Sequence, residues 1–185
     1  MINGESSYLR FLDGDESGMV EIIDEYKNGL TLYLCGITGD VYAAEDVMEE
    51  TFYRLFRKKP KYSPKASFKT WLYTIARNEA ITYLRRRARK NEICIDEAEA
   101  ETETAAVERE FFENERAVTL YRAMQRLNAD YRQILWLSYF DDLSNEQISK
   151  IMKKSARQTE TMLYRARKKL KDELLSEGFV YEDYC

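Results

Sequence analysis

The sequence predicts an all-α protein made of two small helical domains joined by an acidic linker. The 185-residue chain has only seven Gly and two Pro and no run of alternating β-branched residues, so its composition gives no support to a sheet. Apolar residues instead recur every three or four positions, as on the buried face of a helix. The segment 91–115 is the exception: acidic residues, Ala and Thr dominate it, and it is predicted to link domains at 1–90 and 116–178.

Charged residues are segregated along the chain in a way that the net charge of −4 conceals. Residues 54–90 carry thirteen basic residues and one acidic residue, whereas residues 1–53 carry two basic and twelve acidic ones. A basic block favours a polyanionic partner, and an acidic block favours a basic one. We therefore expect one surface for nucleic acid and a separate surface for protein.

Several functional classes find no support in the composition. The chain has no His, the most common general base and metal ligand, and Cys35, Cys94 and Cys185 form no CxxC pair. No cluster of carboxylates, Cys or Gly indicates a catalytic centre, so we expect no enzyme activity, no cofactor and no metal. There is no signal peptide and no apolar segment long enough to span a membrane, which favours a soluble, cytoplasmic protein.

Two helices are predicted before the basic block. The first runs from Asp15 as its cap to Gly39 as its stop signal, and Asp40 can cap the second. In the second helix one face is apolar and the other acidic; the acidic face either binds a partner or is simply solvated. The apolar face comprises Val47, Met48, Thr51, Phe52, Leu55 and Phe56, and the acidic face comprises Glu45, Asp46, Glu49 and Glu50.

A long helix is predicted at 66–90, with Ser67 as its N-cap and an apolar face that includes Phe68 and Leu72. Trp71 and Tyr73 stand among Lys69, Arg77 and a run of Arg from 85. Because bases stack on aromatic rings and phosphates pair with Lys and Arg, this mixture suits single-stranded nucleic acid. The alternative is an ordinary core helix with a solvated basic face.

The second domain is predicted to contain a helix-turn-helix. Helices are expected at 117–127 and at 130–140, where Ile134, Leu135, Leu137 and Tyr139 would be buried. Two capping boxes follow eleven residues apart, Ser144 with Gln147 and Ser155 with Gln158. That spacing is typical of a helix-turn-helix whose second helix enters the major groove of DNA.

Both halves resemble the extracytoplasmic-function (ECF) sigma factors of the sigma-70 family. AAEDVMEETFYRLF is similar to the family's polymerase-binding helix, and SFKTWLYTIARNEAITYLRRR to its promoter-melting and −10 helix. LNADYRQILWLSYFDDLSNEQISKIM and LYRARKKL resemble its region 4. The resemblance implies sigma region 2 at 1–90 and region 4 at 116–178.

The resemblance also implies a function, partners and site residues. The chain would be an RNA polymerase sigma factor that binds the β′ clamp helices and β flap of core polymerase, recognises and helps melt promoter DNA, and is held by an anti-sigma factor. A free-standing helix-turn-helix regulator, which would bind duplex DNA without polymerase, is the alternative. The implied residues are Asp46, Glu49, Glu50 and Phe52 for core polymerase; Phe68, Lys69, Trp71, Tyr73, Arg77, Asn78, Arg85, Arg86 and Arg87 for the −10 element and melting; and Ser155, Arg157, Gln158, Thr161 and Arg165 for the −35 element.

The turn of the helix-turn-helix departs from the family pattern. Lys153 stands where the family usually has Gly, and a non-Gly residue in a left-handed turn costs about 1 kcal/mol. We predict that Lys153 and the following Lys154 contact the DNA backbone, and that Gln158 helps to set the preferred sequence.

Overall fold

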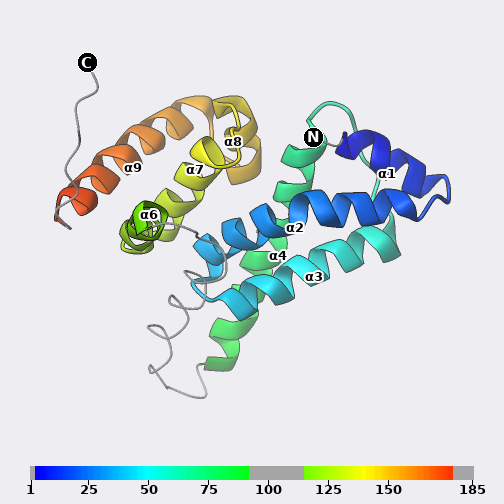
Figure 1. The fold of residues 1–185 in the computed structure, drawn as a ribbon, viewed down its shortest axis with the longest axis horizontal. Coiled ribbons are helices and arrows are strands. Elements are labelled where there is room, and N and C mark those ends of the chain that lie inside the picture. Colours follow the sequence, from blue (N-terminus) through cyan, green and yellow to red (C-terminus); the bar gives the residue numbers. More distant parts are fainter. Residues whose placement is uncertain (1–2, 92–114, 177–185) are drawn as a thin grey trace.

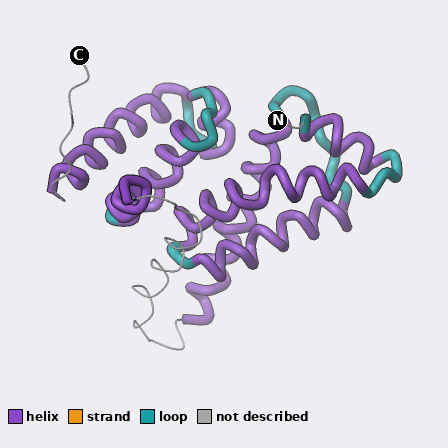
Figure 2. Tube along the Cα trace, viewed as in Figure 1, coloured by secondary structure: helices purple, strands orange, loops and turns teal. Residues whose placement is uncertain are grey.

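The computed structural model describes residues 3–91 and 115–176. Within these ranges the regular elements are all α-helices, and no strand is present (Figure 2), which confirms the predicted fold class. The helices are α1 (Gly4–Leu12), α2 (Ser17–Thr38), α3 (Val41–Lys58), α4 (Phe68–Asn91), α6 (Glu115–Gln125), α7 (Ala129–Tyr139), α8 (Asn145–Met152) and α9 (Ala156–Ser176).

Several helix ends follow the capping residues read from the sequence, although the N-cap of α2 is Glu16 and not the predicted Asp15. Gly39 adopts a left-handed conformation with φ 74° and ends α2, and the Asp40 side chain accepts a hydrogen bond from the Ala43 amide at the start of α3. Ser67 accepts a 3.3 Å bond from the Thr70 amide at the start of α4. Local hydrogen bonding therefore fixes where these helices begin and end.

Helix α1 was not predicted, because the expected helical pattern began only at Asp15. Its nine residues offer two large buried side chains, Tyr8 and Phe11, too few to show a clear period. The Asn3 side chain caps it by accepting from the Glu5 amide at 3.2 Å. The Tyr8 hydroxyl donates to the Pro60 carbonyl at 2.7 Å, which ties α1 to the loop before α4.

Close contact between α1 and α2 depends on Gly18. A Cβ atom at this position would lie 2.1 Å from the Ser7 carbonyl oxygen, a backbone atom that cannot rotate away. We expect Gly18→Ala to lower the free energy of unfolding by about 1–3 kcal/mol, as overpacking does in other cores. Urea denaturation measures this change.

The matched control for Gly18→Ala is Gly36→Ala in the same helix. A Cβ atom there has its nearest neighbour at 3.7 Å, so the substitution should gain up to about 1 kcal/mol from helix propensity. Equal effects at the two positions would contradict the packing argument.

The helices form two groups, α1–α4 and α6–α9, which Figure 1 shows side by side. The first is packed around Leu30, Leu34, Leu55 and Leu72, all fully buried. In the second, α7 lies against α8 and α9 and buries Ile134, Leu135 and Leu137. We call these groups the first and second domains.

Two predicted core residues lie at the surface instead. Phe56 is 45% exposed and stacks on Phe11 with ring centroids 5.7 Å apart, at the edge of the first domain. Tyr139 is 57% exposed, and the Arg167 guanidinium lies 5.3 Å from its ring centroid. Both positions belong to an apolar helical pattern but fall at its margin, where a neighbouring helix covers only one side of the ring.

Candidate nucleic-acid interface

The aromatic residues at the start of α4 are more buried than the sequence suggested. Phe68 is 4% exposed and Tyr73 1% exposed, so neither ring is open to solvent in this structure, and their contact with a DNA strand stays a prediction. Phe68 lies in an aromatic cluster and Tyr73 packs on Tyr33 with centroids 5.2 Å apart. Trp71 remains partly exposed at the edge of that cluster, 5.1 Å from the Tyr8 ring.

The polar residues of the same helix face the second domain. Lys69 Nζ lies 2.8 Å from Oδ1 of Asp141, in the loop after α7, and donates to the Asp141 carbonyl at 3.0 Å. The Tyr73 hydroxyl donates to the same Oδ1 at 2.8 Å. One carboxylate oxygen thus binds two side chains that had been assigned to DNA.

Further contacts continue this interface along α4. Arg77 Nε donates to Gln133 Oε1 at 2.9 Å, and Asn78 Oδ1 accepts from Lys153 Nζ at 2.8 Å. On the neighbouring helix, Arg132 Nε of α7 donates to the Gly36 carbonyl of α2 at 2.9 Å. We call this set of contacts, together with those of Asp141, the closed interface.

Asp141 is held in an unfavourable environment for a charge. Burial raises the pKa of its carboxyl group above the usual range, although Lys69 and Tyr73 favour the ionised form. Its Oδ2 atom is buried and has no hydrogen-bond partner among the described residues. Burial raises the pKa of Tyr73 too, and the neighbouring carboxylate adds to that rise. The closed interface therefore bears a desolvation cost that solvent exposure would relieve.

The C-terminal half of α4 carries the Arg run. Arg85, Arg86 and Arg87 are exposed, and Arg87 also pairs with Asp40 at 3.3 Å. Such side chains can neutralise phosphates on the surface of the helix.

The acidic face of α3 is solvent-exposed at Asp46, Glu49 and Glu50. Phe52 is only 5% exposed and its ring is part of the first domain's core, as its place on the apolar face predicted; its contact with polymerase stays a prediction. Sequence reasoning missed Tyr42 and Tyr53, which are 65% and 57% exposed. The helical spacing could have indicated them, because positions 42, 46, 49, 50 and 53 lie on one face of the helix. We call these five residues the acidic stripe.

The second helix of the predicted helix-turn-helix is α9. Ser155 and Gln158 form its capping box: the Gln158 amide donates to Ser155 Oγ at 3.2 Å, and Gln158 Oε1 accepts from the Ser155 amide at 2.9 Å. Thr161 Oγ1 donates to the Arg157 carbonyl at 2.9 Å. These bonds leave the Gln158 Nε2 donors, the Thr161 methyl group and the Arg157 guanidinium for a ligand.

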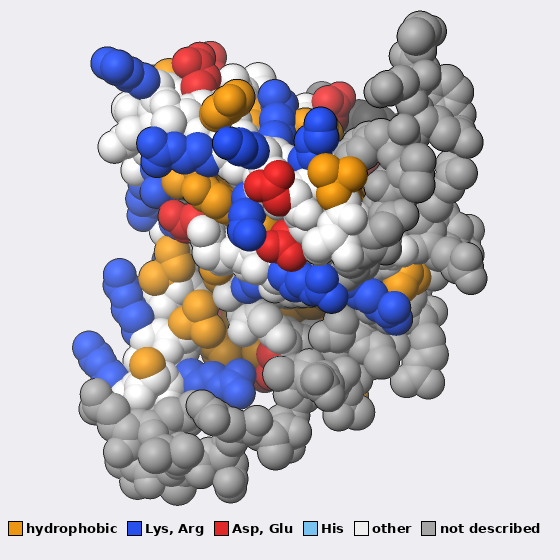
Figure 3. Space-filling model, turned by 90° about the vertical axis from the view of Figure 1, so that its left-hand side faces the viewer, with side chains coloured by type: hydrophobic (Ala, Val, Ile, Leu, Met, Phe, Trp, Pro, Cys, Tyr) orange, Lys and Arg blue, Asp and Glu red, His pale blue; other side chains and the backbone are white. Residues whose placement is uncertain are grey.

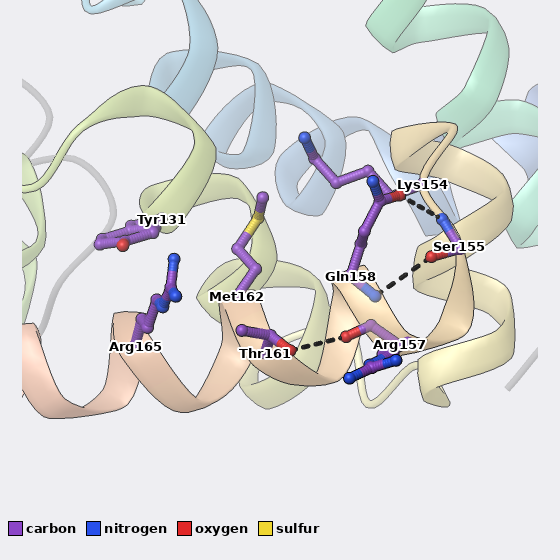
Figure 4. A pocket seen from close by; sticks show the side chains of 8 residues that line it. All are labelled: Tyr131, Lys154, Ser155, Arg157, Gln158, Thr161, Met162 and Arg165. Atoms are coloured by element: carbon purple, nitrogen blue, oxygen red, sulfur yellow. Dashed lines mark hydrogen bonds between the residues drawn. The ribbon is translucent and has the colours of Figure 1, made fainter.

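A groove of about 420 Å³ runs beside these residues (Figure 4). It is bounded by Tyr131 of α7, by Lys154 in the turn and by Arg157, Gln158, Thr161 and Arg165 of α9. The predicted −35 residues thus lie together on one exposed face of α9. Lys and Arg side chains are spread over the side of the molecule on which α9 lies (Figure 3).

The turn residues adopt the predicted conformation but have other partners than DNA. Lys153 has φ 53°, the left-handed conformation expected where Gly is usual. Its ammonium group binds Asn78 across the closed interface, and Lys154 pairs with Asp130 at 3.3 Å. Their predicted contact with the DNA backbone stays a prediction.

In residues 3–91 and 115–176, no group of three or more His, Cys, Asp or Glu side chains is placed to hold a metal ion. None of the helices in these ranges is long and apolar enough to cross a membrane.

Both halves of the chain match models of one protein family. Residues 22–90 match Sigma-70 region 2, and residues 117–170 match Sigma-70, region 4. The chain is 33% identical over 152 residues to the ECF RNA polymerase sigma factor SigM of Bacillus subtilis, covering 82% of this chain and 91% of SigM. It is 27% identical over 172 residues to SigW of the same organism, covering 87% of this chain and 91% of SigW.

Solved structures share the fold. CnrH in complex with the cytosolic domain of CnrY superposes with a TM-score of 0.65 at 19% identity, covering 95% of this chain and 99% of that one. RpoE of Bartonella quintana, in complex with the anti-sigma factor NepR, gives a TM-score of 0.64 at 21% identity, covering 83% and 96%. A free-standing helix-turn-helix regulator would not account for the match to region 2. The chain therefore belongs to the extracytoplasmic-function RNA polymerase sigma factors of the sigma-70 family.

Proposed function

We propose that this sigma factor binds core polymerase through the acidic stripe, captures the opened −10 strand on α4 and reads the −35 element with α9. The acidic stripe and the exposed Arg run of α4 lie on the same domain, and this supports the division of roles. In this scheme residues 1–90 and 116–178 act as regions 2 and 4, and 91–115 links them. The protein lends specificity to polymerase in the cytoplasm and performs no covalent chemistry.

On α4 the residues fall into two groups. Trp71 offers an aromatic face to an unstacked base, Lys69, Arg77 and Asn78 bind strand oxygens and base edges, and Arg85 to Arg87 bind phosphates. Phe68 packs in the aromatic cluster and Tyr73 is buried against Asp141, so neither ring is available to the strand while the closed interface is formed.

The side-chain groups of α9 that make no hydrogen bond within the capping box determine which bases this helix can recognise. Arg157 and Arg165 can donate to guanine in the major groove, and Gln158 Nε2 can donate to an acceptor such as thymine O4. Bidentate binding of adenine by Gln158 would require its Oε1 to accept a second hydrogen bond besides the one from the Ser155 amide. Ser155 serves this helix as its cap.

We also propose an anti-sigma factor as a partner, alongside core polymerase at its β′ clamp helices and β flap and promoter DNA. RpoE was solved with the anti-sigma factor NepR, and CnrH was solved with the cytosolic domain of CnrY. Exposed Tyr42 and Tyr53 offer apolar area that a protein partner of this kind could cover.

Charge reversal on the acidic stripe tests the proposed function. We expect Asp46→Lys with Glu49→Lys to weaken association with core polymerase by about tenfold or more at low salt, because like charges would meet across the interface. The difference should shrink as salt rises. Fluorescence anisotropy of the labelled sigma factor titrated with core polymerase measures it.

The control is the same double charge reversal at Asp24 and Glu25, which are exposed on α2 outside the stripe. It should leave the affinity for core within about twofold of the parent, in line with other rim charges. Parental affinity for the stripe variant at low salt would rule out this polymerase contact.

A further inference from the structure

The C-terminal half of α9 borders a second hollow besides the α9 groove. Its volume is about 290 Å³, and four of the eight residues that line it are basic, against one that is acidic. The lining residues are Arg126, Leu127 and Asn128 at the turn between α6 and α7, Tyr131 of α7, and Arg165, Lys168, Lys169 and Asp172 of α9. We call this hollow the basic cleft.

The cations of the basic cleft are exposed and only partly neutralised. Arg126, Arg165 and Lys168 all lie in contact with solvent. Lys169 pairs with Glu173 of its own helix at 2.8 Å, whereas Arg165 and Lys168 have no ion-pair partner among the described residues. Like charges held this close repel one another, so an anion placed between them relieves the repulsion.

The basic cleft continues the α9 groove. Tyr131 and Arg165 line both hollows, and they stand together at one end of the groove (Figure 4). A DNA backbone that follows α9 from Arg157 would therefore reach the cleft, where Arg165 and Lys168 can bind phosphates. Any other anion that fills the cleft competes with −35 DNA for these cations.

An acidic segment follows α9 directly in the sequence. Residues 177–185, EGFVYEDYC, lie outside the described residues and hold three acidic residues and no basic one. Phe179, Tyr181 and Tyr184 stand among the acidic residues, and aromatic rings stack favourably on guanidinium groups. The segment thus complements the basic cleft both in charge and in the kind of side chain.

The segment is long enough to reach the cleft. Helix α9 ends at Ser176, eight residues beyond Lys168, which is about 12 Å along the helix axis. Glu182 and Asp183 follow Ser176 by six and seven residues, and an extended chain of that length spans about 20–25 Å. Both carboxylates can therefore lie against the basic cleft, and their covalent attachment keeps their effective concentration there high.

We propose that residues 177–185 bind the basic cleft and compete there with the DNA backbone at the end of the −35-reading surface. The proposal rests on the reading role given to α9 above. Glu182 and Asp183 supply the carboxylates, and the cations of the cleft bind them in place of phosphates. The competition weakens backbone contacts and leaves base reading by Arg157 untouched, so it lowers affinity about equally for all −35 sequences.

A nitroxide on Cys185 tests where the segment binds. Cys94→Ser leaves Cys185 as the thiol to be labelled, because Cys35 is buried. In the full-length protein at low salt, the label should broaden the amide NMR signals of Arg126 and Asn128. With Glu182→Gln and Asp183→Asn in the same labelled chain, this broadening should fall by about half or more, because the charges that hold the segment are gone. Equal broadening in the two forms would overturn the docking, since tethering to α9 alone would then explain it.

The same two substitutions, without the label, test the competition. Holoenzyme with Glu182→Gln and Asp183→Asn should bind −35 duplexes about three- to tenfold more tightly than the parent at low salt, and the gain should shrink as salt rises. The control is Asp24→Asn with Glu25→Gln, which makes the same change in net charge at exposed positions of α2. It should leave the affinity within about twofold of the parent.

The other outcomes separate the two claims. An unchanged affinity for the duplexes, or a gain confined to one −35 sequence, would overturn the competition with the DNA backbone. If the parent holoenzyme binds duplexes with and without the −35 element equally, the proposed role of α9 fails instead, and the nitroxide experiment still decides whether the segment docks.

Discussion

Replacing Trp71 with alanine is expected to reduce open-complex formation by about 5- to 150-fold, since one base stacked on an aromatic ring contributes about 1–3 kcal/mol. Of the three aromatic residues assigned to the strand, Trp71 alone keeps a partly exposed ring. The acidic stripe is untouched, so association with core polymerase should stay at the parental level. Permanganate reactivity of unpaired thymines in the holoenzyme complex reports the effect.

Trp71→Phe is the matched control for this variant. It keeps a ring that can stack and that can still pack near Tyr8 and Tyr62, so most open-complex formation should remain. Circular dichroism at the assay temperature establishes that both variants are folded. Parental permanganate reactivity in folded Trp71→Ala would show that bases do not stack at this position.

Replacing Arg157 with alanine is expected to relax the preference at one −35 base pair by about 5- to 150-fold, the value of one good bidentate contact of about 1–3 kcal/mol. Arg157 is exposed at the start of α9 and borders the groove. A randomised −35 library transcribed by the variant holoenzyme shows which position loses its preference.

Lys168→Ala is the comparison for Arg157→Ala. Lys168 is also basic and exposed on α9, but three turns further along. As a phosphate contact it should lower affinity about equally for all −35 sequences and reduce the salt slope by about 1. If Arg157→Ala behaved in this uniform way, its assignment to base reading would be wrong.

The features that the sequence predicts best are the helix caps and turns, which depend on local hydrogen bonds and backbone conformation. Asp40, Ser67 and both capping boxes stand where the pattern placed them, and Lys153 adopts the left-handed turn expected of it. Each of these features depends on residues within four positions of one another, so no knowledge of the tertiary structure is needed to predict it.

Burial along α4 could not be predicted in the same way. The pattern assigned Tyr73 to the basic surface because a single apolar stripe was assumed. In the structure α2 and α3 cover one side of α4 and α8 covers another, so Tyr73 is buried between domains. Phe52 illustrates the converse on α3: the helical pattern placed it on the apolar face, and its burial agrees with that pattern.

No short-range pattern in the sequence indicated the closed interface. Lys69 and Asp141 are 72 positions apart, and Asn78 and Lys153 are 75 apart, across the linker. In each pair, either polar side chain taken alone would be predicted to lie in solvent. Only the placement of α8 against α4 shows that they meet.

Run-off transcription with core RNA polymerase tests the central claim most directly. On a set of candidate promoters, core enzyme with this protein should start transcription at defined sites, whereas core enzyme alone should not, and the protein alone should bind the same duplexes weakly. Tight binding of promoter duplex without polymerase, together with no promoter-specific transcript when polymerase is present, would contradict the account.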